Sequence, residues 1–87
     1  MDVTKMTEER VDELTAELED WMCEVAHEED WLSQANDDII AIWGSKENYL
    51  TELIGWVYDH VCSEDRNDFN WWMSHGFTEE EAKGLAE

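Results

Sequence analysis

Residues 8–30 set the helical character of this chain, and they read EERVDELTAELEDWMCEVAHEED. Apolar side chains recur there at spacings of three and four, which is the spacing of one face of an α-helix. Thr7 is suited to the N-cap, and Glu8 and Glu9 fall in the first turn, where the helix dipole favours negative charge. We expect a helix with one apolar seam, made of Val11, Leu14, Leu18, Trp21 and Val25 and widened by Met22.

Carboxylates cover the remainder of this predicted helix. If residues 8–30 were helical throughout, they would span about 34 Å. That length would carry about one charge per 3 Å, close to the one phosphate per about 3.4 Å of axis in a strand of B-DNA. The carboxylates counted are Glu8, Glu9, Asp12, Glu13, Glu17, Glu19, Asp20, Glu24, Glu28, Glu29 and Asp30.

Two further helices are predicted in the middle of the chain. The first covers residues 29–43, with Asn36, Asp37 and Asp38 as a point where it could break in two. The second covers residues 46–62 after Ser45 as N-cap, with an apolar face wide enough for the central helix of a bundle. Gly55 lies in its middle and costs helix stability, so we expect a neighbouring helix or indole to approach closely there. The expected buried faces comprise Trp31, Leu32, Ala35, Ile39, Ile42, Trp43, Tyr49, Leu50, Leu53, Ile54, Trp56, Val57 and Val61.

The C-terminal third is predicted to be helical but less regular. Residues 63–76 fit either a short helix or a partial loop, ended by Gly76. Thr78 and Glu81 form a capping box for a terminal helix. The stretch HGFTEEEAKGLAE, residues 75–87, resembles the loop and following helix of ubiquitin-associated domains. The same pattern arises wherever a short helix follows a capped one, and we interpret it as a capping signature.

The expected fold is therefore all-α: a single domain over residues 1–87, with three to five helices around a Trp-rich core. The chain has no Pro and six Trp. Four of these, Trp21, Trp31, Trp43 and Trp56, lie on helical stripes and are expected in the core. Because Trp71 and Trp72 are adjacent, one of them should point outward, and Trp71 is the candidate for a partner contact.

The formal net charge of −19 limits the classes of partner. It repels phosphate and anionic lipid, so direct binding to nucleic acid or a membrane surface is not expected. It attracts basic surfaces, which are commonest on nucleic-acid-binding proteins. No signal-peptide core is recognisable in MDVTKMTEER, and no apolar run has transmembrane length. We expect a cytoplasmic protein, in the host cytoplasm if it is phage-encoded, with Cys23 and Cys62 as free thiols.

No cofactor, metal site or catalytic group is predicted. Cys23, His27, His60 and Cys62 contain the residue types of a zinc site, but their spacing fits no finger and the last two diverge by about 200° on a helix. The segment DRNDFNWWMSHG, residues 65–76, lacks calcium ligands at the required offsets. No nucleophile stands beside a base, and there is no Gly-rich phosphate loop. We expect a protein that is not an enzyme.

A small, helical, Pro-free and strongly acidic chain resembles the phage-encoded DNA mimics, which include antirestriction and anti-CRISPR inhibitors. The resemblance is one of composition and architecture, carried by residues 8–30 and by acids at 37–38, 47, 52, 59, 64–68 and 79–81. It implies a non-enzymatic inhibitor that occludes the basic DNA- or RNA-binding groove of a nuclease or CRISPR effector complex. The partner would then be a basic nucleic-acid-binding protein.

The candidate partner-binding residues are chosen from the predicted exposed acids and Trp71, since the resemblance includes no motif by which residues could be transferred. Two other functions stay open at this point: an acidic adaptor that binds through an aromatic patch of Phe69, Trp71 and Trp72, and a helical domain adapted to high salt. A homodimer is also open. The candidates are Glu9, Asp12, Glu13, Glu17, Asp20, Glu24 and Glu28, a second cluster of Asp37, Asp38, Glu64, Asp65 and Asp68, and Trp71.

Overall fold

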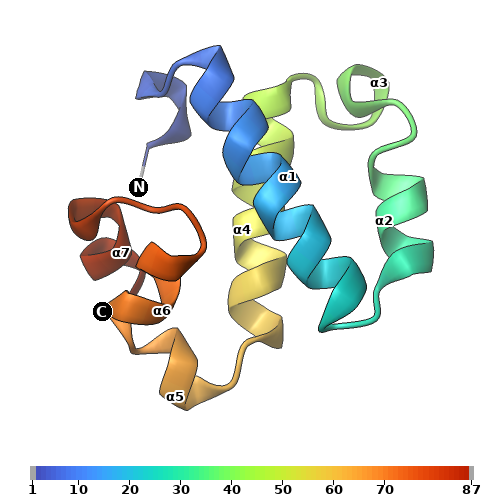
Figure 1. Ribbon diagram of the computed structural model, residues 1–87. Coiled ribbons are helices and arrows are strands. Elements are labelled where there is room, and N and C mark those ends of the chain that lie inside the picture. The colour runs from blue at the N-terminus through green and yellow to red at the C-terminus, as the bar shows by residue number, and fades with distance from the viewer. Residues whose placement is uncertain (1, 87) are drawn as a thin grey trace.

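The computed structural model describes residues 2–86 of the chain, and Figure 1 shows its arrangement. Within these residues there are seven α-helices, one short 3-10 helix and no strand, which confirms the all-α class but exceeds the predicted three to five helices. The elements are η1 (Val3–Lys5), α1 (Glu8–Glu24), α2 (Glu29–Ala35), α3 (Ile39–Trp43), α4 (Lys46–His60), α5 (Ser63–Arg66), α6 (Phe69–Ser74) and α7 (Glu79–Ala86).

The long helices α1 and α4 pack against each other at the centre of the fold (Figure 1). The shorter helices surround this pair, with α2 and α3 on one side and α5, α6 and α7 on the other. Fully burying one valine, leucine or methionine side chain stabilises a fold by about 1.5–3 kcal/mol. The residues buried at the centre include Val11, Leu14, Leu18 and Met22 of α1 and Tyr49, Leu50, Leu53 and Val57 of α4.

Helix α1 begins where the sequence predicts and ends earlier. The Thr7 hydroxyl accepts a hydrogen bond from the Arg10 amide at 3.2 Å, which confirms the N-cap. The helix stops at Glu24, and His27 adopts a left-handed φ of 58° that turns the chain towards α2. The prediction that Val25 completes the buried seam is therefore wrong, since this side chain is 58% exposed.

The predicted helix over residues 29–43 is divided at its polar weak point into α2 and α3. The Asp38 carboxylate caps α3 by accepting a hydrogen bond from the Ala41 amide at 3.1 Å. The indole N–H of Trp43 donates to the Ala35 carbonyl at 2.7 Å, which folds α3 back onto the end of α2. This change of direction leaves Ile42 50% exposed, contrary to its predicted burial.

Residues 63–76 form two short helices, α5 and α6, around a buried indole. Trp72 is fully buried, and its indole N–H donates to the Arg66 carbonyl at 3.0 Å. The capping box of α7 is confirmed, because the Thr78 amide donates to Glu81 at 2.9 Å and the Glu81 amide donates to the Thr78 hydroxyl at 3.3 Å.

The core is mainly aliphatic, so the prediction of a Trp-rich core needs correction. Trp72 alone among the six indoles is fully buried. Trp21, Trp31 and Trp43 are half-buried around the core, and Trp56 is 36% exposed. These large rings cover the edges of a bundle that is too small to enclose them.

Gly55 has no close neighbour, and the predicted approach of a helix or indole is wrong. The residue is exposed on α4, and a Cβ atom built there meets nothing within 4 Å. The absence of a side chain therefore costs helix stability without any packing gain inside the fold.

We predict that Gly55→Ala raises the free energy of unfolding by about 0.5–1 kcal/mol, because alanine fits the helix without a clash. Urea denaturation monitored by circular dichroism measures the change. Gly44→Ala is the matched control, and it should destabilise the fold because Gly44 has a φ of 89°. A Gly55→Ala protein no more stable than the parent would contradict the expectation.

Candidate functional site

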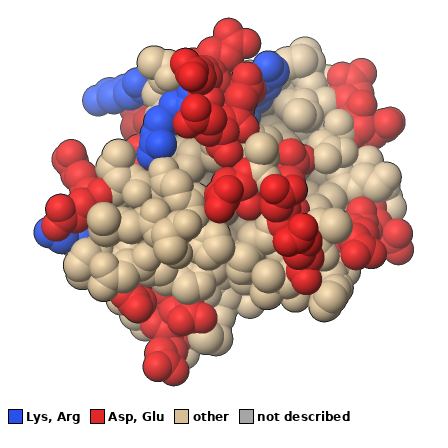
Figure 2. Space-filling model, in the orientation of Figure 1, with Lys and Arg blue, Asp and Glu red and all other residues tan. Residues whose placement is uncertain are grey.

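The exposed side of α1 carries the acidic surface that the sequence predicts. Figure 2 shows acidic side chains running along this helix, with uncharged surface beside them towards α6. Glu19 of this helix is half-buried, and its other acidic side chains are exposed. The exposed acids are Glu8, Glu9, Asp12, Glu13, Glu17, Asp20 and Glu24.

One flank of α1 is tied to the neighbouring helices. Lys46 Nζ lies 3.5 Å from Glu8 and 3.4 Å from Asp12, and the hydrogen bond to Asp12 raises the pKa of this lysine. Glu19 accepts hydrogen bonds from the Tyr49 hydroxyl at 2.9 Å and from Asn36 at 2.6 Å. Burial, and then the bond to Glu19, raise the pKa of Tyr49, so the phenol stays neutral. These acids act as structural groups.

The other flank carries a row of four carboxylates, Glu13, Glu17, Asp20 and Glu24, at successive intervals of four, three and four residues. This spacing aligns them along one side of a helix. In the part of the chain that the structure describes, no Lys or Arg pairs with any of the four. We call them the acidic row.

The C-terminal end of the acidic row lies where the helix itself disfavours negative charge. The last turn of α1 contains Glu24 and no basic residue. The partial negative charge at a helix C-terminus makes a carboxylate there unfavourable, by about 0.3–1 kcal/mol when exposed. The fold therefore tolerates charge at this end rather than gaining stability from it.

His75 of the α6 C-cap faces the acidic row. Its Nδ1 atom lies 3.8 Å from Glu17, and its ring lies 4.2 Å from the Trp71 ring between centroids. Burial lowers the pKa of His75 below its ordinary value of 6.5, and the Glu17 carboxylate opposes this only in part. The imidazole is therefore neutral at pH 7 and leaves the carboxylates uncompensated.

A hollow of about 260 Å³ lies between the C-terminal half of α1 and the end of α6. Trp21 meets Trp71 edge to face beneath this region, with centroids 5.6 Å apart and an interplanar angle of 89°. Carboxylates and apolar groups thus share one concave surface, which we call the α1–α6 groove. Its lining consists of Glu17, Asp20, Trp21, Glu24, Val25 and His75.

The α1–α6 groove contains three residues that sequence reasoning did not place in a site. The helical pattern predicts Val25 and Trp21 in the core, and it indicates no role for His75. The contact between α1 and α6 joins positions about fifty residues apart, and no local pattern encodes it.

The predicted second acidic cluster is not one cluster in the structure. Asp37 and Asp38 lie between α2 and α3, whereas Glu64, Asp65 and Asp68 lie on or just after α5, at the opposite side of the molecule (Figure 1). Several have local structural roles. Asp38 caps α3, Asp68 caps α6 by accepting from the Asn70 amide at 2.9 Å, and Asp65 accepts from the Cys62 thiol at 3.4 Å.

Glu28 and Trp71 occupy different positions from those expected. Glu28 lies beyond α1 and pairs with His60 Nε2 at 3.4 Å. Trp71 is half-buried, with its ring centroid 4.9 Å from that of the buried Trp72 and in contact with the core. It supports the wall of the groove and is not a freely exposed anchor.

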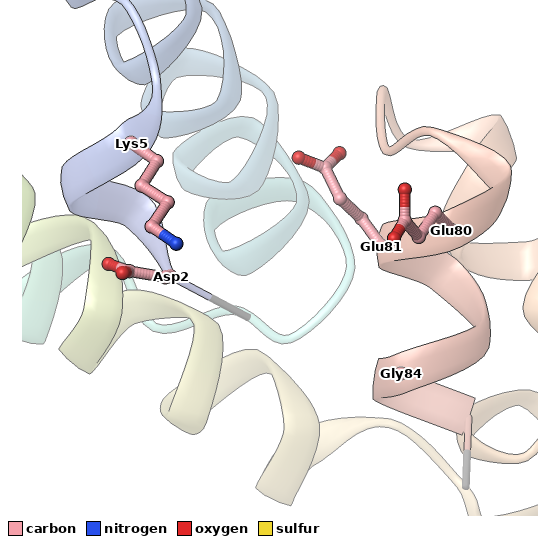
Figure 3. Close-up of a pocket in the computed structure, with 5 residues that line it drawn as sticks. All are labelled: Asp2, Lys5, Glu80, Glu81 and Gly84. Carbon is pink, nitrogen blue, oxygen red and sulfur yellow. The ribbon is translucent and has the colours of Figure 1, made fainter.

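Another hollow, of about 420 Å³, lies between η1 and α7. Figure 3 shows Lys5 and Asp2 on the η1 side and Glu80 and Glu81 on α7. Glu81 pairs with Arg10 of α1 at 2.5 Å. Burial would raise the pKa of Glu81, but hydrogen bonds from the Thr78 backbone and from Arg10 outweigh it and lower the pKa. The ion pair fastens α7 to α1, so this hollow is a structural seam of mixed charge.

Within residues 2–86, no three His, Cys, Asp or Glu side chains converge as a metal-binding group would require. Cys23 and Cys62 are both free. Burial, and then the nearby Glu29, raise the pKa of the Cys23 thiol, which keeps it protonated. Among the described residues, no helix is both long and apolar enough to cross a bilayer.

Comparison of the chain with protein-family models, with curated proteins and with solved structures finds no significant match. The resemblance to DNA mimics therefore rests on composition and helical architecture.

We predict that His75 titrates below its ordinary pKa of 6.5 and that Glu17→Gln lowers the pKa further, because the variant removes a carboxylate that stabilises the imidazolium. NMR titration of the imidazole Cε1–H measures both values. Since the folded pKa is depressed, His75 stabilises the fold above pH 6.5, and this contribution is lost as the pH falls through the folded pKa. An unchanged or higher pKa in Glu17→Gln would rule out the contact.

Proposed function

We propose that this chain is a non-enzymatic inhibitor that mimics nucleic acid and occupies the basic DNA- or RNA-binding groove of a nuclease or CRISPR effector complex. The supporting observation is the outward face of α1. Seven exposed carboxylates lie along a helix of 17 residues, which is about 25 Å long, and Lys46 offsets part of the charge of two of them, Glu8 and Asp12. The resulting spacing of about 3.6 Å per charge is close to the 3.4 Å per phosphate of a DNA strand.

The spacing of about 3.6 Å per charge on α1 is slightly wider than the about 3 Å per charge expected for a continuous helix over residues 8–30. The turn at His27 removes Glu28, Glu29 and Asp30 from the axis of α1. Both the length and the number of charges fall, so the linear density changes little. The mimicking surface is thus shorter than the sequence suggested, and it ends at Glu24.

The distribution of basic residues supports the same function. A face that served only solubility would gain stability from interspersed Lys and Arg, since exposed ion pairs on a helix are worth about 0.3–0.5 kcal/mol each. Lys46 and Arg10 instead lie at the N-terminal end of α1 and connect it to α4 and α7. The acidic row is left free to meet the cations of a partner.

The aromatic-patch function receives no support from the arrangement of the rings. Trp72 is fully buried and Trp71 is half-buried against Trp21, so these two residues and Phe69 do not present a continuous exposed surface. The acidic row is exposed to a partner, whereas the patch of Phe69, Trp71 and Trp72 is largely covered.

We predict that neutralising the acidic row abolishes partner binding. The variant combines Glu13→Gln, Glu17→Gln, Asp20→Asn and Glu24→Gln, and it should fold at least as well as the parent because like-charge repulsion falls. The immobilised parent should retain from bacterial lysate a nucleic-acid-binding protein that added duplex DNA or RNA elutes. The variant should retain at least about tenfold less of it, as expected when several charge-assisted contacts are lost.

The matched control removes the same total charge from other exposed positions, with Asp37→Asn, Glu52→Gln, Asp59→Asn and Glu64→Gln. This protein should bind like the parent to within about threefold, as expected of changes outside an interface. Equal loss in both variants would indicate non-specific attraction by net charge, and equal retention would exclude mimicry by α1.

We also predict a steep dependence of binding on salt. Affinity for the retained protein should fall at least about tenfold between about 50 and 200 mM NaCl, because salt screens exposed charges. Surface plasmon resonance measures the affinity, and circular dichroism over the same range follows the helix content. Salt-insensitive binding would contradict mimicry. A chain that unfolds at 50 mM and folds as salt rises would identify adaptation to high salt as the reason for the charge.

A further inference from the structure

The α1–α6 groove combines an apolar surface with carboxylates. Val25 is 58% exposed although it continues the apolar seam of α1, and the Trp21 ring lies beside it. Val25 and Trp21 thus give this concavity an apolar surface that another molecule can contact. The volume of about 260 Å³ is below the range of about 300–1,000 Å³ that is usual for small-molecule pockets, so the groove suits one side chain rather than a whole cofactor.

The charge of the groove selects the chemistry of that side chain. Glu17, Asp20 and Glu24 contribute three negative charges, and no Lys or Arg among the described residues lines the groove. The groove residue that could become a cation is His75, which Glu17 faces at 3.8 Å and which is neutral at pH 7. A phosphate or carboxylate would be repelled, and a purely apolar group would gain nothing from the three carboxylates.

Arginine matches both surfaces. Its aliphatic stem can cover apolar groups such as Val25 while its charged head reaches the rim. Its planar guanidinium stacks on an indole such as Trp21 and donates several hydrogen bonds to carboxylates at once, which the compact ammonium of lysine cannot do equally well. We infer that the α1–α6 groove receives an arginine side chain of the basic partner. This inference rests on the proposed function, and it adds a fixed docking point to a diffuse acidic face.

The first test uses short peptides in place of the partner. Ac-Arg-Arg-Arg-NH₂ and Ac-Lys-Lys-Lys-NH₂ have equal charge, and each is titrated into the ¹⁵N-labelled chain. The arginine peptide should shift the Trp21 indole N–H and the amides of residues 20–25 and 75 saturably, with at least about tenfold tighter binding than the lysine peptide. Equal affinity for the two peptides, or shifts spread over all acidic segments, would overturn the inference.

The second test introduces a lysine into the groove by substitution. Val25→Lys puts an ammonium beside Asp20 and Glu24, and Ile40→Lys adds the same charge to a comparably exposed apolar position on α3, which does not line the groove. Val25→Lys should weaken binding of the arginine peptide about tenfold, and Ile40→Lys less than about threefold. Similar effects of the two variants would overturn a specific groove. Circular dichroism confirms that both variants are folded.

These measurements separate the groove from the proposed function. The peptide titration needs no partner from lysate. If the arginine peptide prefers the groove but neutralising the acidic row does not reduce capture, the arginine site is retained and mimicry is rejected. If neutralising the row abolishes capture but the peptides show no preference for the groove, mimicry stands and the arginine site is rejected.

Discussion

The packing of α1 against α4 is the constraint on which the rest of the structure depends. A chain with a net charge of −19 repels itself, and apolar burial must offset that repulsion as well as the loss of conformational entropy. Leu14, Leu18 and Met22 of α1 are fully buried, and so is Leu53 of α4. Because the seam of α1 is narrow, most of the circumference of this helix remains free to carry charge. One helix can therefore hold the fold together and display the acidic surface.

The basic residues show how sparingly the charge is neutralised. In the described part of the chain, most of them join elements of the fold or cover aromatic rings, and none lies against the acidic row. The contacts are Arg10 with Glu81, Lys46 with Glu8 and Asp12, Lys83 with Glu79 and over the Phe69 ring, and Arg66 over the Tyr58 ring. Neutralisation by Arg10 and Lys46 thus lies where elements meet, and the acidic row stays uncompensated on the exposed side of α1.

The sequence predicts the beginnings of helices better than their ends or their partners. The caps at Thr7, Ser45 and Thr78 depend on local hydrogen bonds within three residues, so residue types alone reveal them. The end of α1 depends on the turn at His27, which has no such signal. Exposure of the acids on α1 was predictable from helical periodicity. The α1–α6 groove was not, because it forms only when residues far apart in sequence pack together.

The uneven placement of charge along α1 affects how this helix orients in an electric field. Lys46 and Arg10 moderate the negative charge at the N-terminal end, whereas Asp20 and Glu24 are uncompensated at the other end, to which the helix adds its own partial negative charge. Helix α1 with its paired bases is therefore electrically asymmetric along its axis. An electric field exerts a torque on such an arrangement of charge as well as a force. A positively charged surface would turn the C-terminal end of α1 towards itself.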